Sequence, residues 1–227
     1  GFAGVVERLA PERLRFGALD PLVDLLQGTP ADELLPKLVQ RLRGGTTLGD
    51  LVAAGALANA RAHGGTYYNG YHALMALMPS YEMAAQMPAQ YAALPVLKVL
   101  HRNARFCQES GHTESDALAP LDPALRPAGE SALAASVRAR DLARAEHDLA
   151  ELAAGDEAAR ARAYEELQSV VRDDMNVHRV VLSWRAYDLL RLTGPEHATT
   201  MLRQSVRFCI DEDGRRAQRG QAPDEIG

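Results

Sequence analysis

Helix start and stop signals recur along nearly the whole chain, and they constrain the fold more than any other feature. Thr29-Pro30 precedes a segment with leucines at helical spacing, which ends at Gly44-Gly45. Thr47 stands three residues before Asp50, a spacing typical of a capping box, and begins a helix that ends near His63. No segment shows the sustained polar–apolar alternation of a strand. The sequence therefore predicts an all-α fold of about eight or nine helices in a single irregular bundle.

Prolines, glycines and capping residues place the other helix boundaries. Asp173 or Asp174 is expected to cap one helix of the second half, and Thr193-Gly194-Pro195-Glu196 is a strong start signal for the last. We expect helices at residues 68–78, 80–87, 95–109, 130–153, 156–171, 173–189 and 193–209.

The positions of these signals divide the chain into segments. Residues 1–110 form an N-terminal helical half, and residues 130–210 form a C-terminal half. The connecting loop at 111–129 is rich in proline, glycine and polar residues, and residues 211–227 are expected to be a polar tail. We treat the two halves as one domain overall, because 227 residues fit one large domain.

Composition and charge exclude several classes of protein. A net charge of −5 argues against a whole-chain electrostatic interaction with nucleic acid. No apolar run reaches the ~18 to 20 residues of a membrane span. Cys107 and Cys209 are too few for a disulfide scaffold and are read as core thiols. Without such a run we expect a soluble protein, cytoplasmic or periplasmic; because the first residue is not methionine, we also expect that an N-terminal segment has been removed.

The common catalytic motifs are absent from the sequence. There is no phosphate-binding P-loop, no Rossmann glycine pattern, no GxSxG, no HExxH and no CxxC. No pair of ExxH segments is present, so the usual ferritin-like di-iron site is not indicated. The sequence therefore names no reaction by motif alone.

Histidine placement is the remaining chemical signal. Five of the seven histidines lie in or at the ends of apolar helices: His63, His72, His101, His178 and His197. His112 and His147 are expected to face solvent. Facing helices of a bundle can bring imidazoles together as metal ligands or proton-transfer groups. The alternative is that each is a hydrogen-bonded core or surface histidine.

Three local arrangements sharpen this signal. Asp174, His178 and Arg185 share one helix face, although Asp174 could instead form an ordinary salt bridge with Arg179. His197 lies in a first helical turn, where the helix dipole favours the neutral ring, or it is incidental to a capping box.

The third arrangement is the segment from His63 to His72, which holds three of the seven tyrosines. It could line a pocket, with Tyr68 and Tyr71 as cofactor-binding residues. It could equally be a helix–helix corner in which tyrosines cover the core.

The order of several short motifs resembles that of an uncharacterised all-helical family of bacterial, planctomycete-type proteins. The matching segments span most of residues 33–209. They are Gly45-Thr46-Thr47-Leu48, Tyr71-His72-Ala73-Leu74, Leu94-Pro95-Val96-Leu97, His178-Arg179 with Arg185, and Gly194-Pro195-Glu196-His197-Ala198 with Leu202-Arg203. The His-Ala-Leu pattern is also distantly similar to questin oxidase-like proteins.

The chain departs from that family at two positions. Where the family has a second histidine nine residues after the first, this chain has Tyr81 followed by Glu82. Where the family has aspartate after the Leu-Pro motif, this chain has His101. Either exchange could preserve a ligand set while changing its chemistry, or it could mean that the site holds no metal.

Together, these observations predict an internal histidine-rich site that binds a metal ion or haem. We expect His72, His101, His178 and His197 as ligands, Tyr81 or Glu82 as an oxygen donor, and Arg185 as the group that binds an anionic small-molecule substrate. Iron, zinc and copper all suit such ligands, and a metal-dependent oxidoreductase is the activity we expect. The alternative is a non-catalytic helical binding or assembly module with core histidines.

Overall fold

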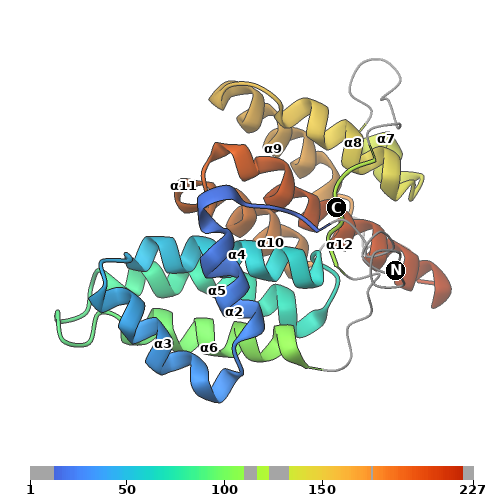
Figure 1. Ribbon diagram of the computed structural model, residues 1–227. Coiled ribbons are helices and arrows are strands. Elements are labelled where there is room, and N and C mark those ends of the chain that lie inside the picture. Colours follow the sequence, from blue (N-terminus) through green and yellow to red (C-terminus); the bar gives the residue numbers. More distant parts are fainter. Residues whose placement is uncertain (1–12, 110–116, 123–132, 175, 222–227) are drawn as a thin grey trace, which may run out of the picture.

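The computed structural model describes residues 13–109, 117–122, 133–174 and 176–221 (Figure 1). Helices cover 76% of these residues, and none of them lies in a strand. Nine of the helices in this part of the chain have seven or more residues. The all-α prediction is therefore confirmed.

The first half holds five α-helices that follow one short 3-10 turn. Their bounds are η1 (Gly17–Leu19), α2 (Asp20–Gly28), α3 (Ala31–Arg43), α4 (Leu48–His63), α5 (Tyr68–Ala84) and α6 (Leu94–Gln108). The capping box at the start of α4 forms as expected: the Thr47 side chain accepts from the Asp50 backbone N–H, and Asp50 accepts from the Thr47 N–H.

The second half is formed by the remaining helices. They are α7 (Leu133–Arg138), α8 (Leu142–Ala153), α9 (Glu157–Val171), α10 (Val177–Asp188), α11 (Leu190–Thr193), η3 (Pro195–His197) and α12 (Ala198–Gln218). Figure 1 shows α10 and α12 between the group α2–α6 and the group α7–α9.

Helix α4 is the centre of the first half. Every residue from 51 to 63 is buried, and the helix contacts α2, α5, α6, α11 and α12. Its many alanines allow these neighbours to approach closely. At the turn after α4, Gly65 has φ +89°, and a Cβ there would lie 2.3 Å from the carbonyl oxygen of Gln204. The turn therefore packs directly against the backbone of α12.

Helix α12 joins the two halves. It contacts α4 of the first half and α8, α9 and α10 of the second. Helix α5 makes the other connection, because it packs against α4 and α6 on its own side and against α10 across the boundary. Among the described residues, no helix is both long and apolar enough to span a membrane.

Several helix boundaries differ from the predicted ones. Pro79 does not end a helix: α5 continues through it to Ala84, because packing against α4, α6 and α10 outweighs the loss of one backbone hydrogen bond. The helix predicted at 130–153 is interrupted at Arg140, after which Asp141 caps α8 by accepting from the Arg144 N–H. Asn176, and neither Asp173 nor Asp174, caps α10.

The C-terminal region differs most. Thr193, the predicted start, is instead the last residue of the short helix α11; Gly194 follows at φ +94°, and α12 begins only at Ala198. Helix α12 then continues to Gln218, through residues that are predicted to belong to a polar tail. Of the predicted loop at 111–129, only residues 117–122 are described, and they contain no helix; His112 lies outside the described residues.

Candidate functional site

Two imidazole rings, from α5 and α10, meet where the halves join. The Nε2 atoms of His72 and His178 are 3.2 Å apart, although 106 positions separate the residues. Further along both helices, Arg185 Nη1 lies 4.0 Å from Glu82 Oε2. The earlier residue of α5 faces the earlier residue of α10, and the later residue faces the later one. The two helices therefore run parallel and are in contact at two positions.

The other ring nitrogen of each histidine faces an acceptor. His72 Nδ1 is 2.7 Å from the Tyr68 carbonyl oxygen, which can only accept. His178 Nδ1 is 3.1 Å from Asn176 Oδ1, and that oxygen also accepts from the His178 backbone N–H at 2.9 Å. Both Nδ1 atoms therefore act as donors, and in the form where each ring holds its proton only on Nδ1, the Nε2 lone pairs face each other.

Several aromatic side chains lie next to the histidine pair. The His72 ring lies 4.4 Å from the Tyr68 ring and 4.8 Å from the Tyr71 ring, centroid to centroid. Tyr71 and Phe208 are buried, and their rings lie 5.4 and 6.2 Å from that of His178. Burial, followed by the charge of neighbouring His72, lowers the pKa of His178. Burial also raises the pKa of Tyr71, so its phenol stays protonated.

Two facing lone pairs repel unless a cation lies between them. A proton on one Nε2 would let it donate to the other, and a metal ion could be bound by both. At bonds of about 2.0 to 2.1 Å, a separation of 3.2 Å between two nitrogens corresponds to an angle of roughly 100° at the ion, close to tetrahedral. Ligands on opposite faces of a haem iron would need about 4 Å between their nitrogens. The geometry therefore fits one metal ion better than bis-histidine haem.

No further potential metal ligand is grouped with the pair in the described part of the chain. No group of three or more His, Cys, Asp or Glu residues is placed there to hold a metal ion. A cleft of about 250 Å³ borders His72 and is also lined by Tyr68, Asn69, Arg102 and Phe106. A small molecule could therefore approach His72 from the side of α6.

The two other predicted histidine ligands lie elsewhere. His101 lines a separate cleft of about 290 Å³ with Lys98, Arg102 and Arg105. His197 precedes α12, and its ring packs on Phe16 at 5.5 Å. It lies eleven positions before Phe208, or about 16 Å along the helix axis. Burial lowers the pKa of His197, so the neutral ring is favoured, as its position in the sequence suggests.

The predicted oxygen donors Tyr81 and Glu82 and the predicted anion-binding Arg185 form a second group beside α11. Glu82 lies between Arg185 and Arg191, at 4.0 and 3.3 Å. Arg185 is also 3.4 Å from Asp188, so its charge is already matched by carboxylates. Tyr81 and Glu82 line a cleft of about 560 Å³. Because Glu82 is ten positions from His72, or about 15 Å along α5, this group is separate from the histidine pair.

Two further histidines complete the comparison. His63 is fully buried at the end of α4, and its ring lies 5.0 Å from that of Tyr67. His147, expected to face solvent, is half-buried, with its Nε2 atom out of contact with water. The burial of His63 agrees with the interpretation that it is a core histidine. The partial burial of His147 differs from the expectation that it faces solvent.

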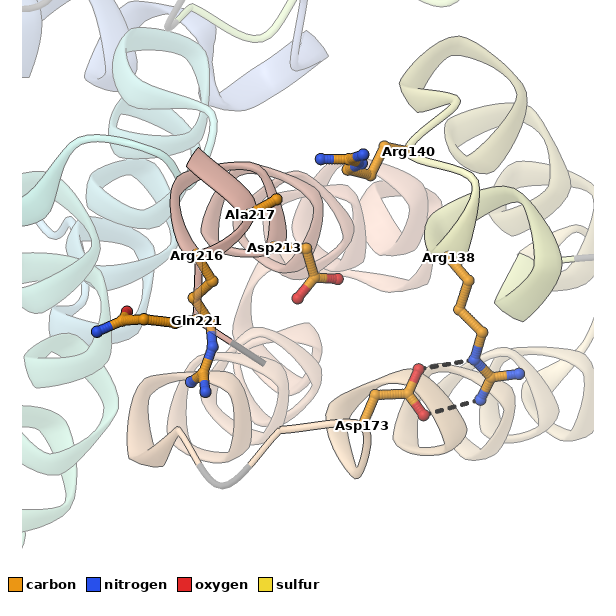
Figure 2. Close-up of a pocket in the computed structure, with 7 residues that line it drawn as sticks. All are labelled: Arg138, Arg140, Asp173, Asp213, Arg216, Ala217 and Gln221. Carbon is orange, nitrogen blue, oxygen red and sulfur yellow. Dashed lines mark hydrogen bonds and ion pairs between the residues drawn. The ribbon is translucent and has the colours of Figure 1, made fainter. Parts of the chain in front are cut away.

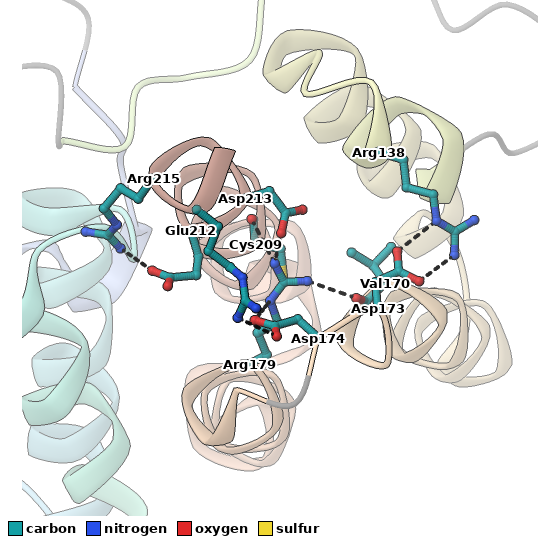
Figure 3. Close-up of polar contacts among 10 residues, drawn as sticks. Arg138, Val170, Asp173, Asp174, Arg179, Cys209, Glu212, Asp213 and Arg215 are labelled. Atoms are coloured by element: carbon teal, nitrogen blue, oxygen red, sulfur yellow. Dashed lines mark hydrogen bonds and ion pairs between the residues drawn. The ribbon is translucent and has the colours of Figure 1, made fainter. Parts of the chain in front are cut away.

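A buried charge cluster was not predicted as such from the sequence (Figure 3). Arg179 is 1% exposed; it donates to the carbonyl oxygens of Val170 and Cys209 at 3.3 Å and pairs with Asp213. Its Nε lies 3.7 Å from Asp174, the salt bridge considered as an alternative above. The sequence does carry a signal that the last helix extends as far as Asp213. Asp211 and Arg215 are four positions apart, a spacing that favours a helix and argues against a frayed tail.

Comparison with known proteins adds no further assignment. No family model, no curated protein and no solved structure matches the chain. The inference of function therefore rests on the geometry of the histidine pair.

Proposed function

We propose that this protein binds a metal ion between His72 and His178. The observation that carries the proposal is the 3.2 Å separation of two Nε2 atoms whose rings both hold their proton on Nδ1. Metal-binding histidines commonly donate the second ring N–H to a carbonyl or carboxylate oxygen, which fixes the ring and its tautomer. Tyr68 and Asn176 supply such acceptors here.

The two imidazole ligands restrict the metal to a class of ions but do not select one of them. Imidazole suits zinc, copper, iron and nickel, so the two nitrogens do not choose among them. With two protein ligands, at least two coordination positions remain for water or a small molecule. Such a site is of the open, substrate-accessible kind, and its metal affinity is expected to be modest.

The reaction class is part of the same proposal. With copper or iron, the site would support oxidoreductase chemistry, the activity predicted from the sequence. Phenols beside the pair support this, since Tyr71 is buried next to both rings and Tyr68 is exposed. Arg185, Tyr81 and Glu82 have no place in this site, because they form the separate group beside α11.

Metal titration of the untagged apoprotein tests the proposal. We expect isothermal titration calorimetry with Cu²⁺ and Zn²⁺ to show one ion per chain. His72→Ala and His178→Ala should each weaken binding by at least ~10-fold, because one imidazole remains. Bound Cu²⁺ should show electron paramagnetic resonance splitting from two nitrogens.

His101→Ala is the matched control, because it removes a half-buried helical histidine that is not part of the pair. It should leave metal affinity unchanged. The proposal is wrong if the wild type binds these ions no more tightly than the His72→Ala/His178→Ala double variant.

One observation favours the alternative, a non-catalytic helical binding or assembly module. Val177, Val180 and Trp184 lie three and four positions apart on α10, and each is at least half exposed. A stripe of this kind is typical of interaction surfaces. Under this alternative, both histidine variants lower the melting temperature and no metal binds.

A further inference from the structure

Another cleft, unconnected with the histidine pair, lies between the α7–α8 turn and α12 (Figure 2). Its volume is about 460 Å³, enough for a small organic molecule. Most of its lining side chains are charged or polar: Arg138, Arg140, Asp173, Asp213, Arg216 and Gln221.

All but one of the charged side chains in this cleft have an opposite charge beside them. Arg138 binds Asp173 through two hydrogen bonds, at 2.7 and 2.9 Å. Asp213 pairs with buried Arg179. Arg216 donates to Asp174 at 2.7 Å, behind the cleft wall.

Arg140 is the exception. Its side chain is exposed, and its guanidinium has no hydrogen-bond or ion-pair partner within the part of the chain that the structure describes. In Figure 2 its side chain extends from the α7–α8 turn toward α12, above Asp213. Among the described residues that line this cleft, Arg140 therefore carries the one positive charge that is not paired with a carboxylate.

The backbone of Arg140 is a second, independent observation. Its φ is +58°, the one positive value at a non-glycine position among the described residues. The Arg140 N–H donates to Val137 O at 2.8 Å, and the Asp141 N–H donates to Ser136 O at 3.0 Å. This is the Schellman arrangement that ends a helix, and glycine is the favoured residue at its left-handed position. Arginine is less favourable than glycine in this backbone conformation, so backbone geometry does not explain why an arginine occupies the position.

We propose that this cleft binds a small molecule through one carboxylate group, with Arg140 as the anchor. The planar guanidinium presents two parallel N–H groups that match the two oxygens of a carboxylate. One unmatched charge calls for a monoanion. A phosphate dianion would bring a second negative charge toward Asp173 and Asp213, so it is disfavoured.

Arg140→Gly is the variant that tests the proposal, because it removes the guanidinium and relieves the backbone at once. Propionate, benzoate and inorganic phosphate are titrated separately into ¹⁵N-labelled protein at constant ionic strength. In the wild type, the carboxylates should cause saturable shifts of the amide resonances of Asp141 and Ala217. In Arg140→Gly the affinity should fall at least ~10-fold, while the melting temperature stays equal or rises.

Arg172→Ala is the matched control. It makes the same change in net charge next to Asp173, but Arg172 does not line the cleft. It should leave carboxylate affinity unchanged.

Three outcomes would each overturn the proposal. The first is that neither carboxylate shifts these resonances. The second is that phosphate binds as tightly as the carboxylates. The third is that Arg140→Gly keeps its carboxylate affinity or lowers the melting temperature, since Arg140 would then not be the anchor or would serve the fold.

Discussion

Replacing Arg179 by methionine should destabilise the protein more than almost any surface change. The guanidinium is buried on α10, donates to the carbonyl oxygens of Val170 and Cys209, and pairs with Asp213. Its Nε also lies 3.7 Å from Asp174. Methionine fills much of the same volume but cannot donate a hydrogen bond to any of these oxygens.

The expected loss can be worked out from the partners that remain. Removing one member of a buried ion pair costs about 3 to 5 kcal/mol, because the other charge is left without compensation. Asp174 keeps Arg216 at 2.7 Å, so the loss falls mainly on Asp213. We therefore expect a loss near the lower end, about 3 kcal/mol in the free energy of unfolding.

The loss should also depend on pH. Burial already raises the pKa of Asp213 above its usual 3.8, although Arg179 acts to lower it. Without Arg179 that pKa rises further, so the carboxyl becomes neutral at moderately acidic pH and its burial costs less. The destabilisation should therefore be smaller at about pH 5 than at about pH 8.

Urea unfolding followed by circular dichroism measures this loss. Lys37→Met is the control, because it removes an exposed i, i+4 pair with Glu33 and should cost no more than about 0.5 kcal/mol. Arg179→Met/Asp213→Asn should recover part of the stability, since no charged carboxylate is left behind. The reasoning fails if Arg179→Met costs less than about 1 kcal/mol, or if the double variant is no more stable than the single.

Three further predictions concern other parts of the fold. Gly65→Ala should lower the free energy of unfolding by at least about 2 kcal/mol, measured by urea unfolding, because it adds a Cβ against the Gln204 carbonyl at positive φ; a neutral result would contradict the close packing on α12. Because burial lowers the pKa of His197 below 6.5, its neutral ring contributes stability that is complete above about pH 6.5 and is lost as pH falls through the folded-state pKa. His197→Asn should flatten that pH dependence in thermal unfolding scans, and an unchanged slope would contradict the assignment. Burial raises the pKa values of the Cys107 and Cys209 thiols to about 12 from 9.0, so at about pH 8 their thiolate fraction falls by roughly 1000-fold. Cys209, whose side chain is fully buried, should therefore react with a thiol reagent such as Ellman's only after unfolding, and fast labelling of this residue in the folded protein would show that it is not protected.

The helices that could be predicted are those with local end signals. The capping box at Thr47 and Asp50 fixes the start of α4, and Gly64 in the left-handed conformation ends it. The errors arise where tertiary packing decides. Pro79 is accommodated because neighbouring helices support α5 on both sides, and the break at Arg140 puts an arginine where the rules favour glycine.

The site could be predicted only in part, for a similar reason. The sequence indicates His72 and His178 as residues able to bind a metal ion, but their contact depends on the parallel packing of α5 and α10, which has no signature in local spacing. His197 is predicted to join them because all three histidines occur in one ordered set of motifs. The length of α12 instead places His197 near Phe16, at the far end of that helix from the pair.

The position of α12 has a consequence for how the chain folds as it is synthesised. This last helix contacts α4, α8, α9 and α10, so it completes the core of both halves at once. A nascent chain that has emerged only as far as α10 therefore leaves the α12-facing side of α4 open to water. We expect such a chain to be protease-sensitive and to depend on chaperones, and the native structure to form cooperatively when α12 leaves the ribosome, long after α4.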